Sequence, residues 1–552
     1  MKIHTLCKKK AHHEYIEDIG VGITLNTFTY NGAGYVKSWQ LSLSNETHYI
    51  GKTIEELIAQ LNQLKDIYDL QYLNEFHTDV LLIYTDDLQM LYYFLKNYDK
   101  DCTLFGEYSF TFKKVFEFRD ISHWYDKPKH DAYDIAKKAQ DLIDNIFKPD
   151  QKFYITPTQS VLKKIKKRCD SDLAKEIYPK NYYDYSRLLK SYFGGICVAN
   201  VRNFIIDEFP MVEYDRKSAY IYDLLIEKHI CEPLKSTNKN NYQFFLDNED
   251  RYFALMKIRI RKIYGINSYL TYMKDINGKK LNEDTELLML TNVDLNLLIN
   301  GCKTLEYDVL SLDVARKDYL PEYLRKVIEE EYIKKEATGT IIQKKKTNSI
   351  YGATVKKYEE DDFTLERDNA YLAPHWGIET AAYARKNLIS LALKLDNWLY
   401  SDTDSIYCED NENNAIIVDE YNNNVDLKIK EYCNKFNSDY DKLKDLGKFM
   451  FKKSIKKMKI NSKKQYMYTD NDNHFELIAS GIPEGMYGEE AYDIPKLSAG
   501  KRKIVKFNPE KTSCNINGTT YESNGSGYIR DMDEFEFIGA SYLSDLITRR
   551  KL

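Results

Sequence analysis

The feature that most constrains this chain is the hexapeptide Tyr400–Ser405, which reads Tyr-Ser-Asp-Thr-Asp-Ser. Apolar residues flank it on both sides, which predicts two short strands meeting at a tight polar turn, the tip of a β-hairpin. Asp402 and Asp404 are two residues apart, so an extended backbone points both carboxylates to one side. Like charges held so close repel each other, and one carboxyl stays protonated unless a cation lies between them. The sequence therefore indicates a divalent metal, Mg²⁺ or Mn²⁺, bound by oxygen ligands.

An Asp-x-Asp pair alone is weak support for a metal site, because aspartate is common in turns for other reasons. A calcium loop of the EF-hand type also begins Asp-x-Asp, but it continues with an oxygen-bearing side chain and a glycine. Ile406 and Tyr407 stand at those positions and exclude such a loop. The metal interpretation depends on the whole hexapeptide and on further motifs in the same chain.

Three other segments complete a known set of motifs. They are Asp215–Tyr220 (Asp-Arg-Lys-Ser-Ala-Tyr), Lys344–Gly352 (Lys-Lys-Lys-Thr-Asn-Ser-Ile-Tyr-Gly) and Lys464–Tyr466 (Lys-Gln-Tyr). With the hexapeptide they follow the order of the polymerase motifs of family B DNA polymerases, and the chain resembles that family.

Two more segments make the resemblance closer to the protein-primed branch, the polymerases of small phages and linear plasmids. Leu290–Leu295 (Leu-Thr-Asn-Val-Asp-Leu) lies between the first two motifs, where that branch has a very similar segment. Tyr192–Gly195 (Tyr-Phe-Gly-Gly) resembles its linker between nuclease and polymerase modules. The correspondence is nearly continuous from Tyr192 onward and weak before about Asp150.

A chain of 552 residues is too long for a single core. The resemblance implies an α+β, multidomain fold: a right-hand polymerase with palm, fingers and thumb, and an N-terminal RNase H-like, exonuclease-type α/β domain. The divisions expected from it are 1–157, exonuclease-like; 158–227, linker and first part of the palm; 228–321, an insertion resembling the terminal-protein-binding region; 322–352, fingers; 353–375, a short second insertion; 376–484, second part of the palm; and 485–552, thumb.

The resemblance also implies the chemistry, a two-metal nucleotidyl transfer. Asp215 and Asp404 are the expected ligands of two Mg²⁺ ions, for which Mn²⁺ can substitute, and Asp402 is the expected assisting catalytic acid. The expected contacts with the incoming nucleotide are Tyr220, Lys334, Lys344, Asn348 and Tyr351. The expected contacts with DNA and primer are Tyr192, Gly194, Gly195, Lys464 and Tyr466.

The nuclease module departs from the family pattern. Its degenerate site comprises Thr24, Asn26, Asp87, His130 and Asp134. Thr24 and Asn26 stand where the first nuclease motif of the family has carboxylates, and two metals cannot be held without them. We therefore predict a nuclease fold that has lost its chemistry. The alternative is a shifted register in which Glu17 or Asp18 supplies the missing acid.

Charge is informative only in its distribution, because the formal net charge is −5. Between Lys448 and Lys464 there are eight lysines and no acid. Such a run alone indicates a solvated face, but beside polymerase motifs it indicates a channel that follows phosphates. The nine cysteines form no Cys-x-x-Cys pair, which argues against zinc sites and fits a reducing compartment. No apolar run reaches membrane-spanning length, so we expect the protein to work in the cytoplasm, that of the host cell if the protein is viral. We also expect a monomer.

Three functions stay open at this stage. The leading hypothesis is a template-directed DNA polymerase that primes from the hydroxyl of a terminal protein, with DNA and dNTPs as its other partners. The second is the same enzyme using only nucleic-acid primers. The third is an inactive DNA-binding scaffold, against which the intact Asp215, Asp402, Asp404 and Lys344 argue.

Overall fold

The computed structural model divides into two compact units, which are described separately. The first comprises Met1–Gln159 with Ala499–Leu552, and the second comprises Ser160–Ser498. The residues that the structure describes are 12–15, 19–30, 33–70, 72–74, 77–86, 88–99, 102–105, 109–125, 131–143, 156–200, 205–479, 488–494, 505–507, 513–516, 519–522, 527–529 and 548–550.

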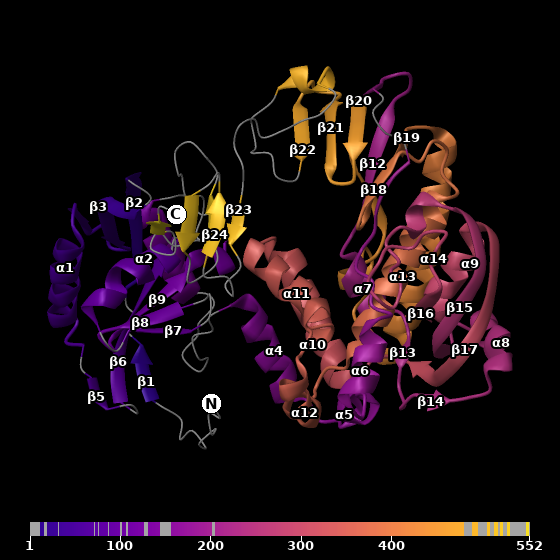
Figure 1. Ribbon diagram of the computed structural model, residues 1–552, viewed down its shortest axis with the longest axis horizontal. Helices are drawn as coiled ribbons and strands as arrows, with labels where there is room; N and C mark the ends of the chain where they lie inside the picture. Colours follow the sequence, from indigo (N-terminus) through magenta and orange to yellow (C-terminus); the bar gives the residue numbers. More distant parts are fainter. Residues whose placement is uncertain are drawn as a thin grey trace. The chain divides into compact units, whose positions relative to one another are not determined.

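The first unit is built on one mixed sheet with strand order β4-β3-β2-β6-β9-β8-β7, and β1 and β5 also pair with β6 (Figure 1). Strands β2, β6 and β9 run parallel, whereas β3 and β4 continue antiparallel. The bounds are β1 His12–Tyr15, β2 Val21–Tyr30, β3 Ala33–Leu43, β4 His48–Gly51, β5 Tyr72–Asn74, β6 His77–Thr85, β7 Thr103–Phe105, β8 Ser109–Phe112, β9 Phe116–Asp120, α1 Ile54–Ile67, α2 Leu88–Leu95 and α3 Ala132–Asp141.

Glycine allows helix α3 to lie directly on strand β2. A Cβ atom on Gly22 would come within 2.2 Å of the Ala132 carbonyl oxygen, so no larger residue fits there without moving the helix. The C-terminal strands of this unit are β23 Val505–Phe507, β24 Ser513–Ile516, β25 Thr519–Glu522, β26 Gly527–Ile529 and β27 Thr548–Arg550.

The second unit contains an antiparallel sheet of eight strands in the order β10-β18-β19-β12-β20-β21-β22, with β11 paired to β20. Its central strand β12 lies between β19 and β20, so two partners fix it along its whole length. The predicted hairpin at Tyr400–Ser405 is confirmed as the β18–β19 pair. The bounds are β10 Cys197–Ala199, β11 Ile205–Ile206, β12 Met211–Arg216, β18 Tyr400–Asp402, β19 Ser405–Glu409, β20 Phe449–Ser462, β21 Gln465–Asp470 and β22 Phe475–Ala479.

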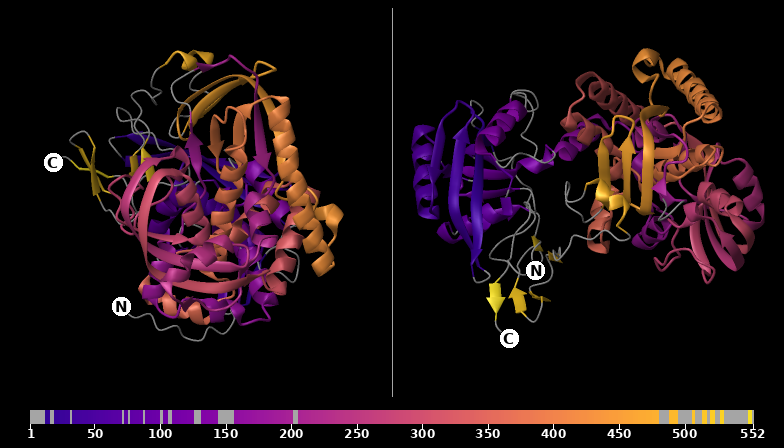
Figure 2. Two further views of the ribbon diagram at one scale, coloured as in Figure 1. Left: turned by 90° about the vertical axis from the view of Figure 1, so that its right-hand side faces the viewer. Right: turned by 90° about the horizontal axis from the view of Figure 1, so that it is seen from above.

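Residues 228–321 form a second sheet, in the order β13-β17-β15-β16 with β14 paired to β17. The long strands β15 and β17 curve together as a ribbon (Figure 2). The bounds are β13 His229–Ile230, β14 Lys235–Ser236, β15 Tyr252–Ile266, β16 Leu287–Thr291, β17 Cys302–Asp318, α8 Tyr242–Asp247 and α9 Asn292–Asn300.

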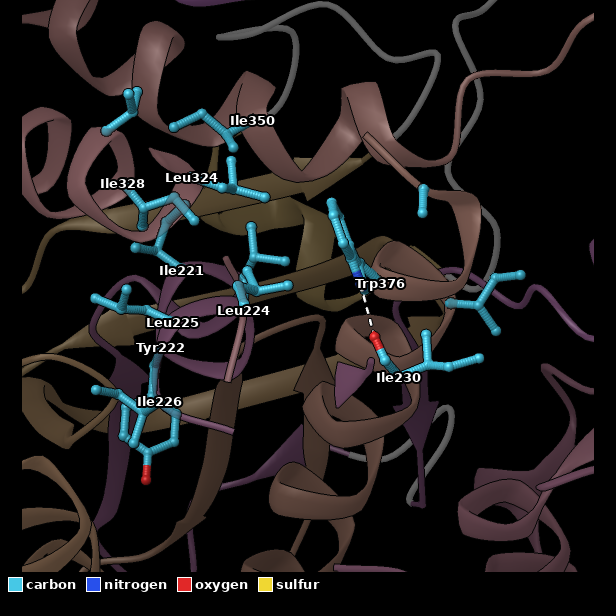
Figure 3. Close-up of a cluster of buried hydrophobic side chains, with 14 of the residues drawn as sticks. Ile221, Tyr222, Leu224, Leu225, Ile226, Ile230, Leu324, Ile328, Ile350 and Trp376 are labelled. Atoms are coloured by element: carbon cyan, nitrogen blue, oxygen red, sulfur yellow. Dashed lines mark hydrogen bonds between the residues drawn. The ribbon is translucent and has the colours of Figure 1, made fainter. Parts of the chain in front are cut away.

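Helices pack against these sheets around a shared apolar core. Ile221, Leu224 and Leu225 of one short helix meet side chains of the longer helices, and the Trp376 indole donates to the Ile230 carbonyl oxygen at 3.1 Å (Figure 3). The bounds are α4 Pro157–Arg168, α5 Leu173–Ile177, α6 Tyr182–Leu189, α7 Ala219–Leu225, α10 Glu322–Thr338, α11 Ile341–Thr354, α12 Glu360–Asp368, α13 Pro374–Ala392, α14 Glu412–Phe436 and α15 Tyr440–Leu443.

Helices α10 and α11 lie side by side and are joined at Gly339, which has the left-handed φ of 60° that favours glycine at a helix end (Figure 1). The short segment that follows them, residues 353–375, contains helix α12. Its Phe363 packs among Tyr178, Tyr182 and Tyr185 from the α5–α6 region. The segment is therefore anchored to the α5–α6 region by an aromatic cluster. None of the helices in the described part of the chain is long and apolar enough to cross a lipid bilayer.

Candidate active site

Two segments far apart in sequence bring acidic side chains together at one edge of the eight-stranded sheet. Asp215 lies near the end of β12 and pairs with Ser405 of β19. Asp402 ends β18, and Asp404 lies in the turn between β18 and β19. The backbone joins the two segments, because the Arg216 amide donates to the Asp404 carbonyl oxygen at 2.8 Å. The structure thus places the three predicted catalytic aspartates around one turn.

That turn is held in an uncommon backbone conformation. Thr403 has φ 63°, a left-handed conformation that is costly for a β-branched residue. Two hydrogen bonds fix it: the Thr403 amide donates to the Ile196 carbonyl oxygen and the Asp404 amide donates to the Asp402 carbonyl oxygen, both at 2.7 Å. The neighbouring chain therefore determines where the two turn carboxylates stand.

The electrostatics of the site follow from this crowding. Burial, together with the charges of Asp215 and Asp402, raises the pKa of Asp404 to about 6. A cluster of carboxylate oxygens in which ionisation of one carboxyl is disfavoured suits a hard divalent cation, because the cation would offset the repulsion between the negative charges. The residues present therefore fit Mg²⁺ or Mn²⁺.

The three aspartates do not form a tight triad. Among the described residues, the group whose potential ligand atoms all lie within 4.8 Å of one another is a different one, Asp470, Asp472 and His474. That group lies at the β21–β22 turn, where Asp470 accepts the amides of Asp472 and His474, so its geometry is that of a hydrogen-bonded polar turn.

Two lysines, from β20 and the β20–β21 turn, reach two of the three predicted catalytic aspartates. The predicted primer contact Lys464 has its ammonium 3.5 Å from Asp402 Oδ1, which also accepts from the Thr403 hydroxyl at 3.0 Å. Lys452, which we did not predict, has its ammonium 3.6 Å from Asp215 Oδ2. Positive charge therefore already lies beside two of the three carboxylates.

A stack of tyrosines stands next to the aspartates. The ring of Tyr220, on α7, lies on the ring of Tyr351, on α11, with centroids 4.3 Å apart and planes 22° from parallel. The Tyr351 hydroxyl is 3.0 Å from that of Tyr192. Burial is the main cause of the raised pKa of Tyr220, so its hydroxyl stays neutral. Three residues predicted for nucleotide or DNA contact thus form one unit.

The Tyr-Phe-Gly-Gly segment packs closely against this unit. A Cβ atom on Gly195 would lie 2.6 Å from the Tyr220 hydroxyl and 2.9 Å from Thr403 Cγ2, whereas one on Gly194 would meet nothing within 4 Å. The segment then enters β10, whose Cys197 pairs with Asp402. The two glycines therefore differ: only the second is required by a close approach.

A buried ion pair holds the same segment. Arg385 of α13 and Asp294 of α9 are both fully buried and lie 2.9 Å apart. Arg385 also donates to the carbonyl oxygens of Phe193 and Gly194. The sequence pointed to the segment around Asp294, but Arg385 has no motif of its own and was missed.

The lysines of α10 and α11 differ in the groups that surround them. The charge of Lys334 acts on Glu331 and Lys346. Its neighbour Lys335 donates instead to the Ser218 hydroxyl at 2.5 Å, in the motif that carries Tyr220. Burial lowers the pKa of Lys335. The charges of Lys344 and Lys217 act in the same direction, and Glu336 opposes them. Lys335 is therefore joined by a hydrogen bond to the motif that carries Tyr220, and the charge of Lys344 acts on Lys335.

Two other predicted contacts differ in accessibility. Asn348 is exposed on α11, one turn from Lys344 and on the same face. Tyr466 is buried, with its hydroxyl 3.2 Å from that of Tyr407 and its ring 4.6 Å from that of Tyr400. Tyr466 thus packs against both strands of the hairpin from within the sheet.

The candidate nuclease positions belong to the first unit. Thr24 is 5% exposed on β2, and Asn26 lies two residues further along the same strand. Asp134 pairs with Lys138 at 2.5 Å on α3. The other positions of interest, Asp87, His130, Glu17 and Asp18, lie outside the described residues.

Comparison with known proteins gives a clear structural match and no sequence match. No family model matches the sequence, and no curated protein matches it significantly. Among solved structures, Phi29 DNA polymerase complexed with primer-template DNA has a TM-score of 0.60 at 14% identity, covering 94% of this chain and 98% of that one. Its orthorhombic crystal form has a TM-score of 0.61 at 15% identity, covering 88% and 97%. The chain therefore has the fold of this polymerase, and the predicted α+β, multidomain class is confirmed.

The raised pKa of Asp404 predicts the direction in which its replacement changes stability when a chelator has removed metal ions. Its folded pKa of about 6 exceeds the unfolded value, so ionisation costs stability, and the cost grows as the pH rises from about 4 to above 6. Asp404→Asn should therefore raise the free energy of unfolding at pH 7.5 by about 2 kcal/mol, with the gain shrinking towards pH 5. Thermal unfolding across that pH range measures it.

The matched control is Asp470→Asn. The His474 and Asp472 amides lower the pKa of Asp470. The ionised carboxylate therefore stabilises the folded protein above the unfolded-state pKa, and this stabilisation is lost as the pH falls. This variant should be no more stable than the wild type at pH 7.5. Destabilisation by Asp404→Asn at pH 7.5 would contradict the crowding of the three aspartates.

The two glycines provide a second prediction. Gly195→Ala should lower the free energy of unfolding by about 1–3 kcal/mol, because the new methyl group overlaps Tyr220 and Thr403. Gly194→Ala, in open space, should change it by less than about 0.5 kcal/mol. Denaturant titration of both variants measures this, and equal effects would show that the close approach at Gly195 is not required.

Proposed function

We propose that the chain is a template-directed DNA polymerase that adds dNTPs to a primer 3′-hydroxyl by two-metal nucleotidyl transfer. The observation that carries the proposal is the meeting of Asp215 with Asp402 and Asp404, from two distant segments, around one strained turn. The fold likeness supports it, since the similar structures include Phi29 DNA polymerase complexed with primer-template DNA and incoming nucleotide substrates. DNA and dNTPs are the partners proposed for this chain.

In this proposal the eight-stranded sheet with α7 and α13 is the palm, and α10 with α11 forms the fingers. Residues 228–321, which fold as a separate sheet, would dock a terminal protein and contact duplex DNA. Residues 485–552 would include the thumb. We further propose protein-primed replication of a phage or linear-element genome, in the cytoplasm.

Asp215 and Asp404 would hold two Mg²⁺ ions, which supply a lowered pKa for the primer hydroxyl and neutralise the leaving pyrophosphate. Lys344 and Lys335 would bind the triphosphate as point charges; the contact of Lys335 with Ser218 and the effect of the Lys344 charge on Lys335 support this. Lys464, beside Asp402, would hold the primer end.

The tyrosine stack would act on the nucleotide sugar. The ring of Tyr220 stacks on Tyr351 and its hydroxyl lies close to the Gly195 backbone, so both contacts resist displacement of the ring. We propose that it excludes a 2′-hydroxyl by contact. Asn348, exposed on the same helix as Tyr351, would lie near the nascent base pair.

Primer extension tests the function. The full chain with primed template, dNTPs and Mg²⁺ should extend the primer, and Asp404→Ala should slow extension about a thousandfold, since metal contacts contribute several kcal/mol to the barrier. Asp470→Ala, an acid removed from the β21–β22 turn, should leave the rate within about twofold. Equal rates for wild type and Asp404→Ala would refute the proposal.

The same assay with the candidate terminal proteins of the element, and no nucleic-acid primer, tests the priming mode. Covalent transfer of the first labelled nucleotide to a protein hydroxyl is the result expected for protein priming. Extension only from nucleic-acid primers would favour the alternative, and binding of DNA without any extension would indicate a scaffold.

We also propose that the proofreading nuclease is lost. Positions 24 and 26 carry no acid, and Asp134 is paired with Lys138. A labelled single strand incubated with Mg²⁺ or Mn²⁺ should therefore stay at full length over many polymerase turnovers. Stepwise shortening that Asp134→Ala abolishes would overturn this, and shortening abolished by Glu17→Ala or Asp18→Ala would identify the shifted register.

A further inference from the structure

A β-bulge places Lys452 beside the candidate active site. Along the β12–β20 ladder, Glu213 pairs with Lys453 and the next residue, Tyr214, pairs with Phe451. Lys452 is therefore the extra residue, without a partner on β12. A bulge bends its strand and re-aims the side chain of the inserted residue, and such bulges are frequent beside active sites.

The re-aimed side chain joins two carboxylates of β12. Its ammonium lies 2.8 Å from Glu213 Oε1 and 3.6 Å from Asp215 Oδ2. Glu213 and Asp215 are two residues apart, so both point to the same side of the strand. Burial acts to lower the pKa of Lys452, but Glu213 and Asp215 outweigh it and raise that pKa, so the ammonium stays charged.

Glu213 explains why the lysine stays in place. Its side chain is 2% exposed, and a buried carboxylate needs a cation to remain ionised without a large cost. Lys453 also approaches it, at 3.8 Å from Oε2, but that ammonium is shared with the Tyr468 hydroxyl and Glu476. Lys452 is the closer partner and the one that also reaches Asp215.

We propose that Lys452, anchored by Glu213, is a positioning residue that holds Asp215 and competes with a divalent cation for this carboxylate. This inference rests on the proposed function, because it assigns Asp215 to a cation. The ammonium repels a cation bound at Asp215, so it weakens cation uptake until the Asp215 carboxylate turns away from Lys452. One of the two cations is then bound weakly in the absence of substrate.

Binding of Mn²⁺ to the full chain, without DNA or nucleotide, tests the inference. Electron paramagnetic resonance of free Mn²⁺ measures the dissociation constant. Lys452→Met should bind Mn²⁺ about three- to tenfold more tightly than the wild type, the range expected for one partly exposed charge. Lys452→Arg, which keeps the charge, should bind as the wild type does.

Lys453→Met is the matched control. It removes the same charge from the adjacent residue, which contacts Glu213 but has no ion pair with Asp215, and should leave Mn²⁺ affinity within about twofold. If Lys452→Met fails to fold because Glu213 loses its cation, the pair Lys452→Met with Glu213→Gln removes one charge of each sign and frees Asp215 from the ammonium, so it should still tighten binding, by less than Lys452→Met. Unchanged or weaker binding in the folded variants would overturn the inference, because a purely structural lysine predicts that result.

The same titration separates this inference from the proposed function. If Asp404→Asn leaves Mn²⁺ binding unchanged, the metal site itself is wrong and the proposed function fails. If Asp404→Asn weakens binding but Lys452→Met does not tighten it, only the role of Lys452 fails. In extension assays, Lys452→Met should lower the Mg²⁺ concentration for half-maximal rate by the same factor as its Mn²⁺ dissociation constant.

Discussion

Mutual repulsion of three carboxylates is the constraint around which the second unit is organised. Nothing in the side chains of Asp215, Asp402 and Asp404 draws them together, so the backbone has to hold them. Strand β12 lies between β19 and β20. The hairpin turn is hydrogen-bonded to the end of β12 and to Ile196, which directly precedes β10. This arrangement requires a left-handed backbone conformation at Thr403 and raises the pKa of Asp404. Strain of this kind persists where the surrounding structure over-determines it, and a bound cation would relieve much of it.

Contacts behind the turn link it to the tyrosine stack. Arg385, held by its ion pair with Asp294, donates to the carbonyl oxygens before Gly195, and Gly195 in turn lies close to Tyr220 and Thr403. The same few residues therefore set both the position of the aspartates and the position of the aromatic ring beside them. Replacing any one of them would disturb both features together, because each contact supports the turn and the aromatic ring at once.

The sequence predicted what short-range patterns determine. The hairpin at Tyr400–Ser405 follows from its flanking apolar residues, and the stack of Tyr220 on Tyr351 joins two residues that belong to recognised motifs. It named Lys334 and missed the contact of Lys335 with Ser218, because adjacent residues on a helix point in different directions and only the packing of α10 decides which one faces Ser218. The sequence also did not show that Tyr466, an expected primer contact, is buried against Tyr400, because tertiary packing decides which side chains of a strand are covered. Lys452 was hidden in a basic run, because one-residue bulges leave no mark in the sequence pattern.

The short segment 353–375 is anchored by packing. The resemblance to family B DNA polymerases implies that this segment replaces an insertion that wraps the template, and its shortness predicts weaker strand displacement. Here α12 is bound by Phe363 to an aromatic cluster of the α5–α6 region, and burying one phenylalanine side chain stabilises such a contact by about 1.5–3 kcal/mol. A segment held in this way cannot also extend around a template strand unless that contact breaks. If the chain is a polymerase, a grip on the downstream template would then have to come from other parts of it, and full-length extension through a long duplex at single-hit enzyme levels would show that they suffice.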